Sequence, residues 1–265
     1  MHGVPTKMLS VSPIRAFSDN YIWMIRGVRD PALVAVVDPG EAEPVRRVLR
    51  EQNLKLSAIL LTHHHADHVG GVPQLVQEHA PVVFGPAGES IPGSPTKLSE
   101  GDTAKLPTLG LEFRVLDVPG HTKGHIVYVG HGALFCGDTL FSAGCGRLFE
   151  GTAEQMHRSL SKLAALPAET LVYCGHEYTL SNLRFGQAVE PGNREVQNHI
   201  ERCKELRARD EATLPSNIGL EHSVNPFLRA ARDTVKRAAE DHVGHALQND
   251  TEVFAAVRAW KDGFK

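Results

Sequence analysis

Four potential metal ligands lie within six residues of this 265-residue chain: His63, His65, Asp67 and His68. Crowded imidazoles repel one another when they are protonated, and a buried neutral imidazole still needs partners for its ring nitrogens. A divalent cation meets both requirements, so the segment predicts a metal site. A solvated loop is the alternative interpretation, and the candidate ligands found downstream weigh against it.

The backbone around these ligands decides which of them share an ion. Residues 58–62 form a short apolar run that predicts a buried strand, and a helical pattern follows the histidines. The ligands therefore lie in the loop that leaves a strand. Residues two apart in a nearly extended backbone point the same way, so His63 and His65 can share one metal. Asp67 and His68 are adjacent and are expected to diverge, which suits a second metal.

Three further candidate ligands each follow a short apolar strand: His121, Asp138 and His176. Sites in α/β proteins are built at strand ends, where loops converge over a rigid sheet. The combined set is five histidines and two aspartates, and Asp138 can bridge two ions through its two carboxylate oxygens. Nitrogen and oxygen ligands without thiolate suit zinc, iron or manganese. We expect two divalent metal ions per chain, and these ligand types do not choose among zinc, iron and manganese.

These motifs resemble the metallo-β-lactamase superfamily. They are His63-x-His65-x-Asp67-His68, Pro119-Gly-His121, Gly137-Asp138 and Gly175-His176. Within that superfamily, residues 137–152, 175–182 and 257–264 resemble glyoxalase II, the hydroxyacylglutathione hydrolases. The similarity runs from about Asp19 to the C-terminal end.

The resemblance implies an α/β fold, a metallo-β-lactamase-like αββα sandwich of two mixed sheets, with a small all-helical domain at the C-terminal end. The hydrophobic pattern agrees with this, because short strands alternate with Gly and Pro turns up to about residue 175 and helical periodicity follows. Predicted strands cover 21–26, 33–37, 58–61, 81–84, 111–118, 126–129, 133–136 and 171–174, and later helical patterns cover 153–166, 196–206, 227–240 and 252–261. We predict a metal-binding catalytic domain over residues 1–178 and a helical substrate-binding domain over residues 179–265.

The resemblance further implies a metal-dependent thioester hydrolase. Its substrate would be an S-2-hydroxyacylglutathione such as S-D-lactoylglutathione, and its products a 2-hydroxy acid (D-lactate) and glutathione, in the second step of methylglyoxal detoxification. A pair of divalent ions suits this reaction because it lowers the pKa of a bridging water from about 15.7 toward about 7. Asp67 and Asp138 are the candidates for managing the proton. The sequence has no G-x-S-x-G elbow, P-loop or G-x-G-x-x-G motif, so a serine nucleophile or a nucleotide lacks support.

Contacts with glutathione also follow from the resemblance. Arg258 and Lys261 would hold the glycine carboxylate, and Tyr178 would hydrogen-bond the peptide portion. Arg147 stands where many relatives have lysine and keeps the positive charge, whereas Phe149 lacks the hydroxyl of the tyrosine that is common there. The alternative for Arg258 and Lys261 is an exposed helix end, where cations interact favourably with the helix dipole.

Three nearby residues are assigned no ligand role. His64 lies between two ligands and is expected to point away from them. His125 is predicted to pack beside the site. Asp38 is predicted first as a turn former, and second as a residue that orients a ligating imidazole.

Two other functions remain open. One is a different enzyme of the metallo-β-lactamase fold, such as a persulfide dioxygenase with a single iron, although Asp67 and His68 favour two metals. The other is a non-catalytic binding module that a metal stabilises. A metal assay separates the first from a two-metal hydrolase, and an activity assay excludes the second.

The composition of the sequence limits the kinds of partner that the chain can bind. The formal net charge of −3 and the absence of a basic run in the sequence make nucleic acid a poor partner. No apolar stretch approaches the roughly 18 residues of a membrane span, and residues 1–7 lack the apolar core of a signal peptide. The four cysteines show no CxxC spacing, which predicts reduced thiols in a cytoplasmic protein. We expect a monomer that binds a small glutathione thioester.

Overall fold

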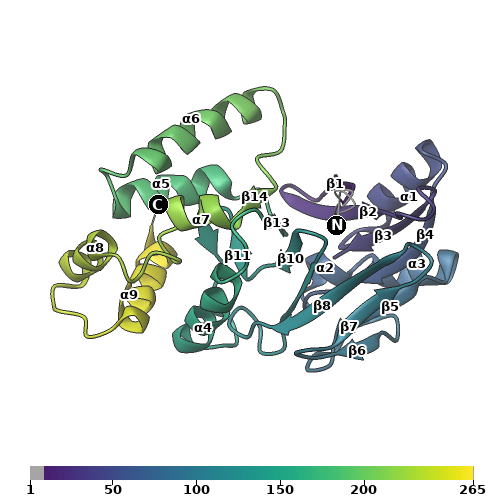
Figure 1. The fold of residues 1–265 in the computed structure, drawn as a ribbon, viewed down its shortest axis with the longest axis horizontal. Coiled ribbons are helices and arrows are strands. Elements are labelled where there is room, and N and C mark those ends of the chain that lie inside the picture. Colours follow the sequence, from purple (N-terminus) through teal and green to yellow (C-terminus); the bar gives the residue numbers. More distant parts are fainter. Residues whose placement is uncertain (1–8, 265) are drawn as a thin grey trace, which may run out of the picture. The chain divides into compact units, whose positions relative to one another are not determined.

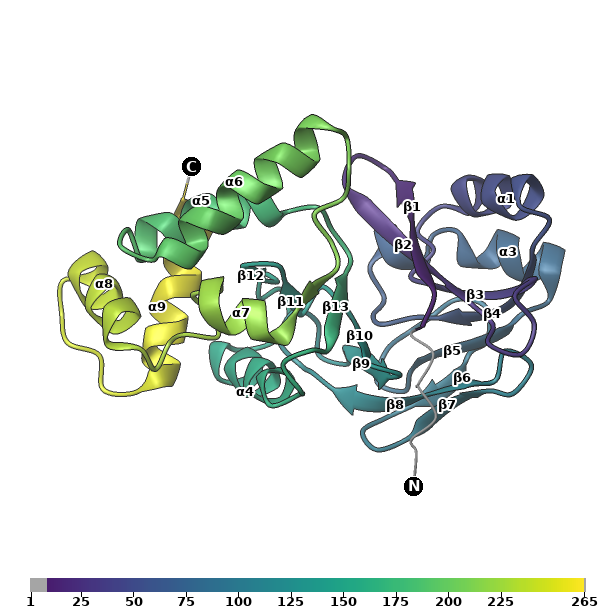
Figure 2. The same ribbon diagram turned by 45° about the horizontal axis from the view of Figure 1, so that its top comes forward.

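The computed structural model describes residues 9–264, so the segment 1–7 considered above lies outside the described residues. The chain divides into two compact units (Figures 1 and 2). The first comprises the described residues up to Asp117 together with Gly124–Gly137, and the second comprises Val118–Lys123 and the residues from Asp138 onward.

The first unit contains a six-stranded sheet with the order β1-β2-β3-β4-β5-β6. Its strands are β1 (Val11–Ala16), β2 (Asn20–Arg26), β3 (Leu33–Val37), β4 (Lys55–Leu60), β5 (Val82–Pro86) and β6 (Thr96–Leu98). The pairs β1–β2 and β2–β3 are antiparallel, whereas β3–β4, β4–β5 and β5–β6 are parallel. Strands β2 and β3 are almost continuously apolar because both faces of the sheet are buried.

Helices cover one face of this sheet. They are α1 (Ala42–Glu51), α2 (Ala66–Val69) and α3 (Val72–His79), and Figure 2 shows α1 and α3 side by side next to the strands. One buried core cluster contains Val45 and Leu49 of α1 and Leu75 of α3, together with strand residues such as Ile22 and Ile59. This burial follows from the apolar stripe of an amphipathic helix.

Four antiparallel strands complete the first unit: β7 (Thr103–Leu106), β8 (Leu111–Asp117), β9 (Ile126–Gly130) and β10 (Ala133–Gly137). Residues 111–115 alternate between buried and exposed, the pattern of a strand with one face in the core. The phenolic hydroxyl of Tyr128, on β9, donates a 2.9 Å hydrogen bond to the carbonyl of Leu61, directly after β4. This bond fixes the chain just before the histidine motif.

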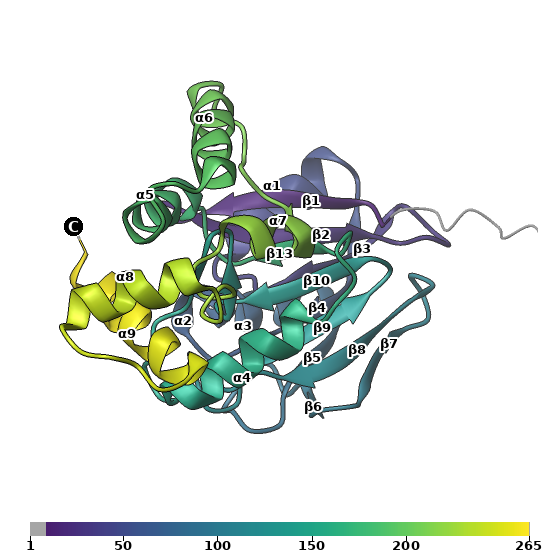
Figure 3. The ribbon, with the colours of Figure 1, turned by 60° about the vertical axis from the view of Figure 1, so that its left-hand side comes forward.

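The second unit is largely helical (Figure 3). It contains α4 (Ala153–Ala164), α5 (Thr179–Val189), α6 (Arg194–Ala208), α7 (Ile218–Val224), α8 (Asp233–Val243) and α9 (Asp250–Gly263), with the strands β11 (Leu140–Phe141), β12 (Gly144–Cys145), β13 (Leu171–Cys174) and β14 (Ser216–Asn217). A capping box between Thr152 and Gln155 begins α4. Leu183, Val196 and Ile200 pack α5 against α6.

The predicted fold class is confirmed, since the chain forms two mixed six-stranded sheets with helices and a helical C-terminal region. The helix predicted over residues 227–240 starts later, at Asp233, because residues 227–232 form turns in which Asn225 Oδ1 accepts from the Phe227 amide at 3.0 Å. The sequence also gave no sign of β14. The domain boundary at residue 178 stays a prediction. Among the described helices, none has the length and apolarity to cross a membrane.

Candidate active site

The first unit carries the four ligand candidates of the histidine motif beyond the end of β4. His63 and His68 are buried, and His63 Nε2 lies 3.1 Å from His65 Nδ1, as expected for side chains that point the same way. The expected divergence of Asp67 and His68 is wrong. Both residues lie in α2, and His68 Nε2 is 3.5 Å from Asp67 Oδ2, so the tips of the two side chains meet.

Asp38 orients two histidines of this cluster. It follows β3 and accepts hydrogen bonds from the Thr62 amide at 2.8 Å and the Thr62 hydroxyl at 2.6 Å. Its Oδ2 also lies 3.1 Å from His68 Nδ1, which must therefore donate. Since the Thr62 hydroxyl proton is committed to Asp38, Thr62 Oγ1 accepts from His63 Nδ1 at 3.0 Å. In both imidazoles Nε2 is therefore unprotonated and carries a lone pair, which is the form that binds a metal.

Neighbouring side chains support this arrangement. The His125 ring is stacked on His63 with ring centroids 4.6 Å apart, which agrees with the predicted packing role. His64 is half-buried beside His65, with centroids 5.0 Å apart, and its exclusion from the ligands stays a prediction. Asn20 was missed from the sequence. Its Nδ2 donates to Asp67 Oδ2 at 3.0 Å and so orients this carboxylate.

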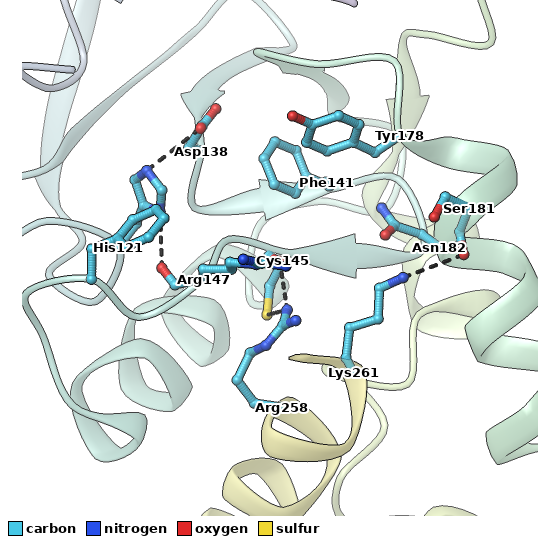
Figure 4. A pocket seen from close by; sticks show the side chains of 11 residues that line it. His121, Asp138, Phe141, Cys145, Arg147, Tyr178, Ser181, Asn182, Arg258 and Lys261 are labelled. Atoms are coloured by element: carbon cyan, nitrogen blue, oxygen red, sulfur yellow. Dashed lines mark hydrogen bonds and ion pairs between the residues drawn. The ribbon is translucent and has the colours of Figure 1, made fainter. Parts of the chain in front are cut away.

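The second unit brings the other three ligand candidates together. Asp138 Oδ2 lies 3.5 Å from His121 Nε2 and 3.3 Å from His176 Nε2. His121 Nδ1 donates to the carbonyl of Arg147 at 2.9 Å, which again leaves Nε2 as the ligand atom (Figure 4). A side chain at Gly146 would lie 2.0 Å from the Asp138 carbonyl oxygen, so only glycine fits this close approach.

These donors fit divalent metal ions. Three imidazoles, His63, His68 and His121, are held with Nδ1 as the hydrogen-bond donor, so Nε2 carries the lone pair. Carboxylate oxygens lie near the Nε2 atoms of His68 and His121. Nitrogen and carboxylate ligands with such outer partners are typical of zinc, iron and manganese sites. The buried His and Asp clusters are consistent with a binuclear metal site.

A pocket of about 390 Å³ lies within the second unit. Its lining comprises His121, Asp138, Phe141, Cys145, Arg147, Phe149, Tyr178, Ser181, Asn182, Arg258 and Lys261. Figure 4 shows the cations of α9 on the side away from Asp138 and His121. The pocket therefore joins two of the ligand candidates to all five predicted substrate-binding residues.

Arg258 and Lys261 differ in their surroundings. Arg258 is only 4 % exposed, so the alternative of an exposed helix end is wrong for this residue. Its guanidinium donates to the carbonyl of Cys145 at 2.9 Å and to Asp262 at 3.0 Å. Lys261 is half-buried, and its Nζ donates to the Ser181 carbonyl at 3.4 Å. Burial, reinforced by Arg258 and other nearby arginines, lowers the pKa of Lys261 to about 8.

The remaining predicted contacts border the ligand histidines. Tyr178 stacks on His176 with centroids 4.6 Å apart, and Phe149, 63 % exposed, meets His121 edge-on at 5.3 Å. Arg147 is exposed, and its Nε lies 3.6 Å from Asp262. Cys145 is buried in the pocket lining, and burial raises the pKa of its thiol to about 11.

Comparison with known proteins places this site in a family. A model described as "Metallo-beta-lactamase superfamily" matches residues 17–176, and one described as "Hydroxyacylglutathione hydrolase C-terminus" matches residues 177–264. The hydroxyacylglutathione hydrolase of Nitrosomonas eutropha is 51 % identical over 258 residues, covering 97 % of this chain and 100 % of the relative. That of Alkalilimnicola ehrlichii is 56 % identical over 255 residues, covering 96 % and 99 %. The crystal structure of ETHE1 from Myxococcus xanthus superimposes with a TM-score of 0.63 at 26 % identity, covering 96 % and 98 %.

The sheets, the His and Asp clusters and the match over residues 17–176 define a protein of the metallo-β-lactamase superfamily. With its full-length relatives and its matching C-terminal region, the chain belongs to the hydroxyacylglutathione hydrolases, the glyoxalase II family. The predicted family and enzyme class are thereby confirmed.

Proposed function

We propose that the chain cleaves S-2-hydroxyacylglutathione thioesters, with S-D-lactoylglutathione as the expected substrate, to a 2-hydroxy acid and glutathione. The ions would be held by seven residues in two groups: His63, His65, Asp67 and His68 in the first unit, and His121, Asp138 and His176 in the second. The observation that carries this proposal is the pairing of imidazole Nε2 with carboxylate oxygen in each unit. Zinc is the expected metal, with iron and manganese as alternatives.

When bound, a pair of divalent ions supplies an activated water and polarises a carbonyl. The chain's own residues prepare the site for that chemistry. Asp38 and the Arg147 carbonyl hold His68 and His121 in the ligating tautomer, so no rearrangement is needed. Asp67, oriented by Asn20, and Asp138 are the proposed groups for managing the proton.

The pocket in the second unit suits the glutathione portion. Lys261 and Arg258 supply positive charge for the glycine carboxylate, and Arg147 adds a third cation to the pocket lining. Tyr178 and Phe149 place aromatic surface beside His176 and His121, and the Tyr178 hydroxyl would hydrogen-bond the peptide portion of glutathione. Phe149 has no hydroxyl, so its contribution is restricted to apolar contact.

The direct test is hydrolysis of S-D-lactoylglutathione by the purified chain, followed by the loss of thioester absorbance. We expect turnover with about two metal ions per chain by elemental analysis. Activity should disappear with a strong chelator and return on adding zinc, iron or manganese. Hydrolysis by a fully metal-free preparation would contradict the proposal, and one iron per chain without thioester turnover would favour a persulfide dioxygenase-like enzyme.

A monomer in the cytoplasm is part of the same proposal. The four cysteines are all buried, which suits a compartment that keeps thiols reduced. Light scattering coupled to size-exclusion chromatography measures the oligomeric state, and a mass of twice the 28.9 kDa chain would contradict the monomer.

A further inference from the structure

The turn between β11 and β12 lies on the wall of the pocket in the second unit. Phe141 and Cys145, on the two sides of this turn, both line the pocket. The turn itself spans residues 141–144. Side chains distant in the sequence hold its backbone, and two of them, Glu221 and Asn225, are not among the residues that line the pocket.

Asn225 holds both ends of the turn. Its Nδ2 donates to the carbonyls of Phe141, at 3.2 Å, and Gly144, at 2.9 Å. The same Nδ2 lies 3.0 Å from Glu221 Oε2. Asn225 is itself fully buried, and its Oδ1 accepts from the Phe227 amide at 3.0 Å, which fixes the amide orientation.

Glu221, on α7, holds the centre of the turn. Its Oε2 accepts from the backbone N–H of Ala143 at 2.8 Å. Ala143 has a φ of 54°, in the left-handed region that disfavours residues with a Cβ, so an external bond is needed to keep it there. Glu221 is fully buried. Burial raises its pKa, although the hydrogen bonds from Asn225 and Ala143 act in the opposite direction.

The turn connects this buried pair to the substrate pocket. The carbonyl of Cys145 accepts from the Arg258 guanidinium at 2.9 Å, so a displaced turn also displaces the cation. The Phe141 ring meets Tyr178 edge-on at 5.3 Å. Any movement of the turn therefore reaches two of the proposed glutathione contacts.

We propose that Glu221 and Asn225 are positioning residues, which set the affinity for the glutathione portion of the substrate by holding the turn 141–144 in its binding conformation. This inference rests on the proposed function of the pocket. The alternative is a buried polar pair that stabilises the unit and has no selective effect on binding.

The test compares two disruptive variants with a conservative one. Asn225→Asp keeps the side-chain shape and replaces the donor with an acceptor, and Glu221→Ala removes the acceptor for Ala143. Each should raise KM for S-D-lactoylglutathione by about tenfold or more, with kcat within about threefold and metal content unchanged. Glu221→Gln keeps an oxygen acceptor and should stay within about twofold of the wild type.

A matched control separates positioning from lost stability. Val235→Ala truncates a buried side chain on α8, away from the turn, and should lower the melting temperature without changing KM. If the disruptive variants do not fold, Glu221→Asp serves as the milder test. Its shorter side chain retracts the acceptor from Ala143, and KM should still rise.

Calorimetric binding of glutathione gives a second measurement. Weaker glutathione binding in Asn225→Asp and Glu221→Ala, with Glu221→Gln and Val235→Ala like the wild type, supports positioning. Unchanged KM and glutathione affinity in the disruptive variants overturns it, as does an equal rise of KM in Val235→Ala. A wild-type chain that neither cleaves the thioester nor binds glutathione instead refutes the proposed function.

Discussion

The two groups of ligand candidates are built in different ways. In the first unit, four ligand candidates come from one short segment, and Asp38 and Thr62 orient two of them, His68 and His63, from the ends of adjacent strands. In the second unit, His121, Asp138 and His176 come from three separate loops, and a backbone carbonyl, that of Arg147, orients His121. A local motif can therefore be recognised in the sequence from its spacing, whereas a dispersed one depends on how the whole unit packs.

The largest effect is expected at Asp138, the carboxylate placed between two imidazoles in the second unit. Asp138→Asn should lose metal and activity together, with activity falling by more than about 100-fold, because an amide offers one neutral oxygen in place of an anionic pair. Elemental analysis and thioester turnover measure both losses. His64→Ala, in the first unit, is the control and should keep both metals. Equal metal content in the two variants would contradict the division into ligands and bystanders.

A smaller loss of metal affinity is expected on substituting Asp38, which contacts His68 and Thr62. Asp38→Asn should weaken metal binding by about 10- to 100-fold, because the amide can present a donor to His68 Nδ1 and disturb its tautomer. Competition with a chelator measures the affinity. In the second unit, the Arg147 carbonyl plays the corresponding part for His121. Unchanged metal affinity would show that the tautomer is set by another contact.

Substrate affinity should respond at Lys261 without loss of chemistry. Lys261→Ala should raise KM by about tenfold and leave kcat and metal content near wild type, because a carboxylate that does not change during the reaction is bound equally in the ground and transition states. Steady-state kinetics give both constants. Arg258→Ala is a less selective variant, since it also removes the donor to Cys145. A thioester without the glutathione peptide should be insensitive to Lys261→Ala.

The smallest effect is a pH dependence of binding. The pKa of Lys261 is lowered to about 8, so the ammonium is present below that pH and is lost above it. The value of kcat/KM for glutathione thioesters should therefore fall by a few-fold as pH rises through about 8. Lys261→Arg keeps its charge in this range and should flatten the decline. An identical decline in Lys261→Arg would assign it to another group.

Local pattern predicted much of this molecule. The placement of polar residues after short apolar strands identified His121, Asp138 and His176 as ligand candidates. It did not predict how these residues are arranged in space. It failed where a short helix intervened, because α2 brings Asp67 and His68 together. The role of Asn20 was invisible, since only the folded sheet brings it to Asp67.

The substrate pocket was harder to predict than the ligands. Arg258 and Lys261 are three residues apart on one helix, yet one is buried and the other half-exposed, because β12 and Phe227 cover only the first. Glu221 and Asn225 carry no chemical motif at all. Their proposed positioning role depends on the left-handed backbone conformation of Ala143, and an alanine in the sequence does not predict that conformation.

The burial of the cysteines bears on how the enzyme tolerates oxidised glutathione. The thiolate is the form that attacks a disulfide, and a pKa of about 11 leaves only about one Cys145 thiol in ten thousand ionised at pH 7. Burial likewise raises the pKa of Cys203 to about 12. Oxidised glutathione reaching the pocket would therefore exchange slowly with Cys145, so the enzyme should resist inactivation by mixed disulfides while it releases glutathione.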